Sequence, residues 1–151
     1  MGHVRHIQRV EAPIEDVWAL SMRVDRLPEW NPYQDVEHLT GPLDQVGTAF
    51  DSTLRLLGQR LAAHCTVTQV DPGRLLRITS SSPEGASEWT YRYEQAGGGT
   101  LCALDIEYDL GHGPVAAVLD RLLFQHALER AVRHMAENFA AIAEARVRQP
   151  A

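Results

Sequence analysis

The residues with the greatest chemical capability stand at alternate positions in short apolar runs. The run WTYRY places Trp89, Tyr91 and Tyr93 two residues apart, and RHIQR spaces His6 and Gln8 in the same way. Because the side chains of a strand alternate between its faces, each set points to one side of a sheet. An imidazole moves protons near neutral pH, a phenol hydrogen-bonds a carbonyl oxygen, and an indole stacks on a flat ring. This combination suits an aromatic, oxygen-rich small molecule.

Other common chemistries are disfavoured by the polar side chains that alternation directs inward. These are Ser52, Cys65, Ser80, Trp89, Tyr91, Tyr93 and Tyr108, joined by His6 and Gln8 if the first strand keeps Val10 inward. The set holds no carboxylate, so paired-carboxylate acid/base chemistry is not expected. The histidines at 6, 38, 64, 126 and 134 lack the shared-face spacing of metal ligands. Since phosphate-loop, dinucleotide and nucleophile-elbow motifs are also missing, we expect neither a metal nor a cofactor.

Turn signals and periodicity divide the chain into the elements that must position these side chains. A strand is predicted over residues 3–10, and APIEDVWAL predicts a helix with Pro13 at its first position and acidic residues in its first turn. From Val36 onward, turn signals separate runs of about 8 to 12 residues, which is typical of an antiparallel meander. The segment after Pro114 contains no further Gly or Pro through Val147, which predicts one long helix.

The hairpin turns predict which residues lie beside each other across the strands. A tight turn at LLGQ pairs Phe50 with Val67, and the turn at SPEG places Ile78 beside Tyr91. All four hairpins then put apolar residues on one face and polar residues such as Thr90 on the solvent face. The two cysteines would lie three strand spacings apart, which is too far for a disulfide.

The inward face of this sheet needs a cover, and the long helix is the element of adequate length. At 100° per residue one stripe of that helix holds Phe124, Leu128, Ala131, Val132, Met135, Phe139 and Ile142. Large rings beside small side chains on the sheet face indicate a hollow between sheet and helix. We predict that the ligand contacts Gln8, Tyr33, Phe50, Ser52, Leu54, Cys65, Val67, Ile78, Trp89, Tyr93, Leu104, Leu128 and Met135.

The segment LPEWNPY, residues 27–33, separates the early helix from the meander. Prolines at 28 and 32 forbid a long helix across it, so it is a short helical turn or a stiff loop. Trp30 is either a core plug against Met135 or Phe139 or part of a cavity wall. Tyr33, which follows the second proline, is expected to reach the cavity.

Six short motifs cover nearly the whole chain in a characteristic order: APIEDVW (12–18), LPEWNP (27–32), VGTAF (46–50), VTQVDPGR (67–74), WTYRY (89–93) and GGGT (97–100). In this order they resemble the SRPBCC superfamily of START-related, birch-pollen-allergen-like proteins, and more closely its polyketide cyclase/dehydrase branch. The resemblance implies one α+β helix-grip domain over residues 1–151. In that fold a seven-stranded antiparallel sheet wraps around one long C-terminal helix, with two short helices after the first strand.

The resemblance leaves the activity open, because this fold serves aromatase/cyclases, hydrophobic-ligand carriers and chaperone activators alike. As a polyketide cyclase or dehydratase, the protein would hold a poly-β-ketone chain in one geometry. His6 would then be the general acid/base, with Tyr91 or Tyr108 polarising a carbonyl. As a carrier, it would only sequester or transfer a hydrophobic small molecule or lipid. Cys65 is interpreted as an inert buried thiol in both cases.

Length and charge set the remaining bounds. A chain of 151 residues fits one domain with a substantial core. Its 14 basic residues are all arginine and form no stripe, and the net charge is −6, so nucleic acid is not an expected partner. No apolar stretch approaches the roughly 18 residues of a membrane span, and no signal-peptide core is evident, which predicts a cytoplasmic location. The oligomeric state stays open between a monomer and a homodimer.

Overall fold

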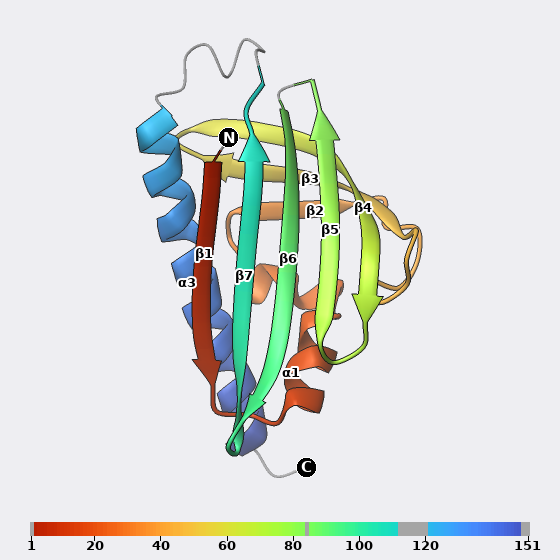
Figure 1. Ribbon diagram of the computed structural model, residues 1–151, viewed down its shortest axis with the longest axis vertical. Helices are drawn as coiled ribbons and strands as arrows, with labels where there is room; N and C mark the ends of the chain where they lie inside the picture. Colours follow the sequence, from red (N-terminus) through yellow and green to blue (C-terminus); the bar gives the residue numbers. More distant parts are fainter. Residues whose placement is uncertain (1, 84, 112–120, 149–151) are drawn as a thin grey trace.

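One antiparallel sheet curls around the carboxy-terminal helix in a computed structural model that describes residues 2–83, 85–111 and 121–148 (Figure 1). Its seven strands lie in the order β1-β7-β6-β5-β4-β3-β2. The strands are β1 (Gly2–Val10), β2 (Gln34–Glu37), β3 (Ala49–Leu56), β4 (Gln59–Asp71), β5 (Leu75–Ser82), β6 (Gly85–Ala96) and β7 (Gly99–Asp109). All neighbours are antiparallel, so the predicted helix-grip α+β fold is confirmed.

Two short helices follow the first strand, as the resemblance implied. Helix α1 (Ile14–Ser21) begins one residue later than predicted: Pro13 has φ −60° and ψ 148°, an extended conformation that makes it the N-cap. The 3-10 helix η1 (Val24–Glu29) contains Pro28 and ends before Trp30. A 3-10 turn suits this segment because a short helix loses few hydrogen bonds to a proline.

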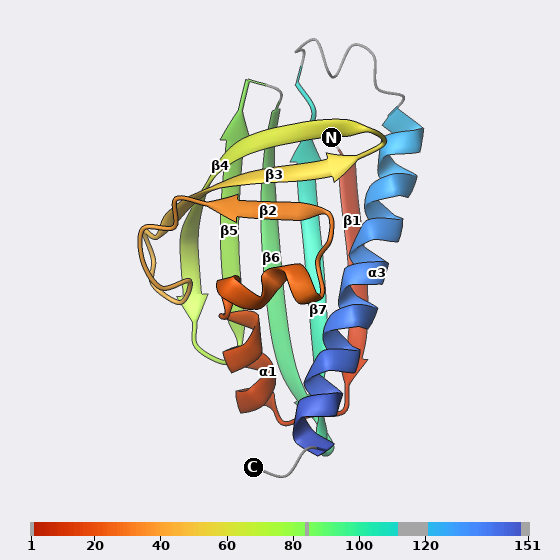
Figure 2. The same ribbon diagram turned by 180° about the vertical axis from the view of Figure 1, so that it is seen from behind.

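The long helix α3 (Arg121–Arg148) runs beside β1 and over the concave face of the sheet, and Figure 2 shows α1 and η1 next to its lower half. The predicted helix start near Pro114 lies outside the described residues. Phe124, Leu128, Ala131 and Val132 are buried, which confirms this part of the predicted stripe. Further along the stripe, Met135, Phe139 and Ile142 are only half-buried. Within the described part of the chain, no helix is long and apolar enough to cross a membrane.

The predicted register between β3 and β4 was wrong by two residues. Phe50 pairs with Cys65 and not with Val67. The physical reason is the turn, which consists of Leu57 and Gly58 alone, both with positive φ (52° and 72°). Such a two-residue turn matches the twist of the flanking strands.

The register between β5 and β6 was also wrong by two residues, because Ile78 pairs with Trp89 in place of Tyr91. A shift of two keeps a side chain on its predicted face, since the side-chain period of a strand is two.

A further correction concerns the exposure of Thr90 to solvent. This residue lies on the outer face but is only 5% exposed, because the Arg77 guanidinium lies over it and donates to its hydroxyl at 3.2 Å.

Candidate functional site

Two adjoining hollows lie between the concave face of the sheet and helix α3. The first hollow has a volume of about 150 Å³ and the second about 120 Å³. Gln34, Phe50, Ile78 and Tyr91 line both, so these four residues form the junction between them. An apolar cavity of about 150 Å³ is large enough to hold a benzene ring. Each hollow therefore has roughly the capacity for one ring or a short chain.

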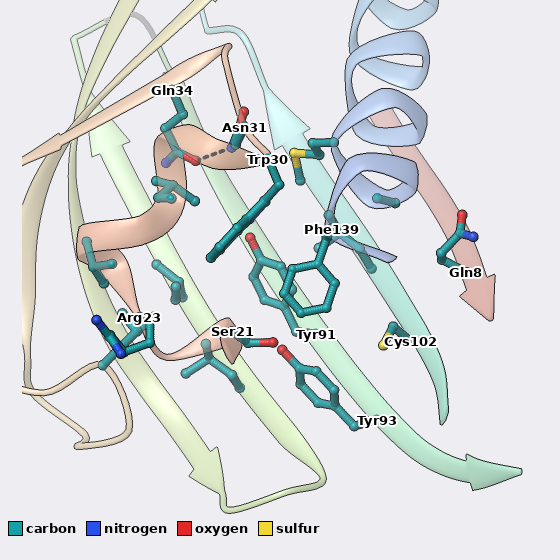
Figure 3. Close-up of a pocket in the computed structure, with 18 of the residues that line it drawn as sticks. Gln8, Ser21, Arg23, Trp30, Asn31, Gln34, Tyr91, Tyr93, Cys102 and Phe139 are labelled. Carbon is teal, nitrogen blue, oxygen red and sulfur yellow. Dashed lines mark hydrogen bonds between the residues drawn. The ribbon is translucent and has the colours of Figure 1, made fainter. Parts of the chain in front are cut away.

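The first hollow is enclosed by β1, the segment after α1, and the second half of α3 (Figure 3). Trp30 packs edge-on against Phe139, with ring centroids 5.2 Å apart and an interplanar angle of 84°. Trp30 is 7% exposed and also lines the hollow. The two alternatives that the sequence left open, a core plug and a cavity wall, therefore describe two sides of one side chain.

The second hollow has strands β3 to β7 of the sheet on one side and the first half of helix α3 on the other. Its walls are mostly apolar and include Leu54, Trp89 and Leu128. Its serines and its indole largely satisfy one another: the Trp89 Nε1 donates to Ser87 at 3.0 Å, and Ser87 is hydrogen-bonded to Ser80. This hollow is therefore suited to recognise a ligand by its shape more than by hydrogen bonds.

Tyr91 is the polar residue on β6 that faces both hollows, and its hydroxyl points upward in Figure 3, away from its strand. Among the residues that the structure describes, none hydrogen-bonds this hydroxyl. Every fully buried side-chain polar atom of those residues has a partner, so the Tyr91 hydroxyl is not fully buried. The hydroxyl therefore borders the open space of the hollow. Burial raises the pKa of Tyr91 well above its usual value, and Cys65 nearby adds to the rise. The phenol stays protonated and remains a hydrogen-bond donor at neutral pH.

His6 lies in the same row of the sheet as Tyr91. Both residues pair with Leu104 of the intervening strand β7, so their Cα atoms are about 10 Å apart, or two strand spacings. The His6 Nε2 is 3.0 Å from the Gln8 Oε1, and the Gln8 amide nitrogen donates to the Arg9 carbonyl. Gln8 therefore accepts from His6, which places the imidazole proton on Nε2 and leaves Nδ1 as a base.

The hydroxyls of the other two inward tyrosines face polar groups of the helices. Tyr108 donates to the Gln125 Oε1 and packs edge-on against Phe124 at 5.2 Å. The Tyr93 hydroxyl faces that of Ser21 (Figure 3), and this interaction opposes the upward shift of its pKa by burial. These two phenols connect the sheet to its helices, whereas the Tyr91 hydroxyl is available to a ligand.

The cysteines are free thiols that lie on strands three apart, β4 and β7. Burial raises the pKa of Cys65 to about 11 and that of Cys102 to about 12. A thiol reacts as the thiolate, so both are poor nucleophiles near neutral pH.

Most residues predicted to contact the ligand line one of the hollows. The first contains His6, Gln8, Phe50, Ile78, Tyr91, Tyr93, Leu104 and Met135, and the second adds Ser52, Leu54, Cys65, Trp89, Tyr108 and Leu128. Val67 and Tyr33 line neither. Val67 is fully buried in the core, and Tyr33 turns to α3, where its hydroxyl is 2.8 Å from the His134 Nδ1.

Several lining residues were not predicted from the sequence, above all Asn31 and Gln34. The alternation of Gln34 with Val36 was the available signal, because both point inward from β2. Ser21, the last residue of α1, and Arg23, just before η1, also line the first hollow. Arg23 is paired with Asp25 at 2.7 Å.

The structure also brings together two histidines that the sequence placed apart. His38 and His64 approach opposite oxygens of Asp51 at 2.9 and 3.0 Å on the outer face. Both imidazoles lower the pKa of the Asp51 carboxyl, the His64 hydrogen bond contributing most. No group of three or more His, Cys, Asp or Glu side chains suited to a metal ion occurs among the described residues.

Several solved structures share this fold across nearly the whole chain. The ZhuI aromatase/cyclase from Streptomyces sp. R1128 has a TM-score of 0.82 at 20% identity, covering 97% of this chain and 96% of its own. A START superfamily protein from Mycobacterium smegmatis has a TM-score of 0.75 at 14% identity, with 95% and 97% covered. The protein TTHA0849 from Thermus thermophilus has a TM-score of 0.73 at 20% identity, with 93% and 99% covered. At these identities the likeness establishes the fold alone.

A comparison with known protein families identifies the family of the chain, which the structural likeness alone does not. No curated protein matches the chain. The sequence profile of the family described as "Polyketide cyclase / dehydrase and lipid transport" matches residues 1–144. With the helix-grip fold and the two hollows, this match places the protein in the SRPBCC superfamily, whose fold binds hydrophobic ligands. The chain belongs to the polyketide cyclase/dehydrase and lipid transport family.

Proposed function

We propose that the protein binds an aromatic or polyketide molecule across the two hollows and promotes its cyclisation and dehydration. The observation that carries the proposal is the Tyr91 hydroxyl, a protonated donor with no partner among the described residues, at the junction of two mostly apolar hollows. An apolar site with a few convergent polar groups is typical of small-molecule recognition. The family description and the aromatase/cyclase fold neighbour support the same chemistry.

The reaction would use two groups of this chain. The His6 Nδ1 takes a proton from a methylene between two carbonyls, and the resulting enolate carbon attacks a second carbonyl. Tyr91 donates a hydrogen bond to the oxygen of that carbonyl while it becomes an alkoxide. The protonated imidazole returns the proton to the alkoxide, and the hydroxyl later leaves with a neighbouring hydrogen as water. Because about 10 Å separates the two Cα atoms, an extended substrate can contact both side chains.

The second candidate is a carrier that binds the same kind of ligand without reaction. It is favoured by the lining itself, in which the only charged side chains among the described residues are Arg23 and Arg92 in the first hollow and Asp109 in the second. Arg23 is already paired with Asp25, and the Asp109 Oδ1 accepts from the Gly111 N–H. The imidazole of His6 is therefore the main group of the described lining for proton transfer.

The test combines binding with turnover. The purified protein is titrated with aromatic polyketide products while tryptophan emission is recorded, since Trp30 and Trp89 line the two hollows. The protein is then added to a reconstituted minimal polyketide synthase, and the product distribution is compared with and without it. A changed distribution supports the cyclase. Saturable binding with an unchanged distribution rejects the cyclase and leaves the carrier, and the absence of both rejects the ligand site.

A further inference from the structure

Gln34 occupies an unusual place in the site, because its amide is held at both ends and lines both hollows. Asn31 Nδ2 donates to the Gln34 Oε1 at 3.1 Å, a bond drawn in Figure 3. Gln34 Nε2 donates to the Ser52 Oγ at 2.8 Å. These bonds fix the side chain across the junction where Tyr91 also stands.

The orientation of the Gln34 amide is determined by the backbone. The Tyr33 N–H donates to the Asn31 Oδ1 at 3.1 Å, so this atom of Asn31 must be the carbonyl oxygen. The Asn31 NH₂ group therefore faces Gln34, which must answer with its own oxygen and turn its NH₂ group to Ser52. Asn31 is 3% exposed, so little water competes for this chain of bonds.

The same chain leaves donors facing the hollows. Gln34 Nε2 has a second hydrogen, and Ser52 accepts from Gln34 and so directs its own hydrogen elsewhere. Among the described residues no acceptor takes either hydrogen, and the Tyr91 hydroxyl is unpartnered as well. An amide N–H can only donate. A ligand atom that meets Gln34 Nε2 must therefore be an acceptor, and in an apolar surrounding a mismatched group costs affinity.

We propose that Gln34, oriented by Asn31, is a specificity-determining residue that selects ligands with a carbonyl oxygen at the junction of the two hollows. The inference rests on the proposed function, since it concerns the ligand of the same site. It adds the chemical class of the ligand, a ketone flanked by two ring-sized apolar groups, and the residue that recognises the carbonyl group.

A matched pair of probes measures this preference directly. The two probes, benzophenone and diphenylmethane, carry one ring on each side of the central carbon and have nearly the same shape. They differ by one carbonyl in place of a methylene. Their dissociation constants are measured by tryptophan quenching for each variant, and the ratio of the ketone affinity to the hydrocarbon affinity is compared between variants. Differences in hydration of the free probes cancel in this comparison.

Gln34→Leu is expected to lower the ratio about fivefold to tenfold, the value of one net hydrogen bond, without weakening the hydrocarbon. Asn31→Asp should lower it similarly with residue 34 intact. Its carboxylate accepts from both Tyr33 and Gln34, so the Gln34 amide turns over and presents its oxygen to Ser52. Asn138→Leu is the control, because this amide donates to the Trp30 carbonyl at 3.2 Å but lines neither hollow. Its ratio should stay within about twofold of the wild type.

The outcomes separate this inference from the proposed function. Binding of both probes with an unchanged ratio in Gln34→Leu and Asn31→Asp overturns the selection by Gln34 and leaves the ligand site standing. An equal drop in Asn138→Leu also overturns it, because the effect would then come from general loosening of the segment. Failure of the wild-type protein to bind either probe overturns the ligand site and the inference with it. Circular dichroism confirms folding, and Asn31→Asp decides the matter if Gln34→Leu does not fold.

Discussion

Replacing Tyr91 by Phe should separate the stability of the protein from its function, because the hydroxyl has no partner among the described residues. A buried polar group without a hydrogen bond costs about 1 to 3 kcal/mol, part of which is recovered where the group borders a hollow. Tyr91→Phe keeps the ring and removes that cost, so the free energy of unfolding should be unchanged or rise by up to about 1 kcal/mol. For a domain of this size, 1 kcal/mol corresponds to a shift in Tm of about 2 to 4 °C. Binding of a ketone ligand should weaken about fivefold to tenfold.

Tyr93→Phe is the matched control. Its hydroxyl faces that of Ser21, and its ring packs edge-on against Trp18 at 5.1 Å. This substitution should lower the free energy of unfolding by about 1 kcal/mol, because it removes the interaction of the phenol with the Ser21 hydroxyl. Both Tm values come from differential scanning calorimetry of the ligand-free proteins. If Tyr91→Phe destabilises the protein as much as Tyr93→Phe does, the Tyr91 hydroxyl is a structural group, and the assignment of a ligand-facing donor is refuted.

Three further predictions concern proton transfer, alkaline stability and the core. If the protein is a cyclase, His6→Ala should lower turnover by roughly 100-fold to 10,000-fold in the reconstituted synthase assay, the range for a lost proton-transfer group, and an unchanged rate would remove His6 from the mechanism. Each buried thiol keeps its proton longer in the folded than in the unfolded chain, so stability should fall as pH rises above 9, by about 2 kcal/mol per thiol at pH 11. Denaturant titrations should show a shallower fall in Cys65→Ala, and an identical fall would contradict the burial argument. Ile106→Ala, at a side chain 1% exposed, should cost about 2 to 5 kcal/mol, whereas Ile7→Ala, 53% exposed, should cost under about 1 kcal/mol in the same titrations.

The strand faces could be predicted from the sequence because they depend on local alternation alone. His6, Gln8 and Val10 share the inward face of β1, and Tyr91 and Tyr93 share that of β6, as their spacing of two requires. Errors in the β3–β4 and β5–β6 registers did not disturb this, because each error was of two residues. The family resemblance was likewise carried by short motifs read in order.

The partners of the side chains within the site could not be predicted from the sequence, because they depend on contacts between distant segments and not on local alternation. Tyr91, Tyr93 and Tyr108 look alike in the sequence, each at an inward position with a phenol. Their roles differ because Ser21 and Gln125 come from helices far along the chain, and the packing of those helices decides which hydroxyl receives a partner. A local pattern holds no information about such contacts.

The sequence by itself determined the fold class, the inward face of each strand and the apolar character of the interior, since these follow from the period of the side chains and the turn residues. Only the tertiary structure decided that the interior contains two hollows, that Tyr33 points away from them towards His134, and that Asn31 and Gln34 line them. Tyr33 and Gln34 are neighbours in the chain, and the direction of each is set by what stands opposite: an imidazole of α3 for Tyr33, and the Asn31 amide and the Ser52 hydroxyl for Gln34. Hydrogen-bond partners and close packing fix these directions, across 101 residues of sequence for Tyr33 and across 3 and 18 residues for Gln34.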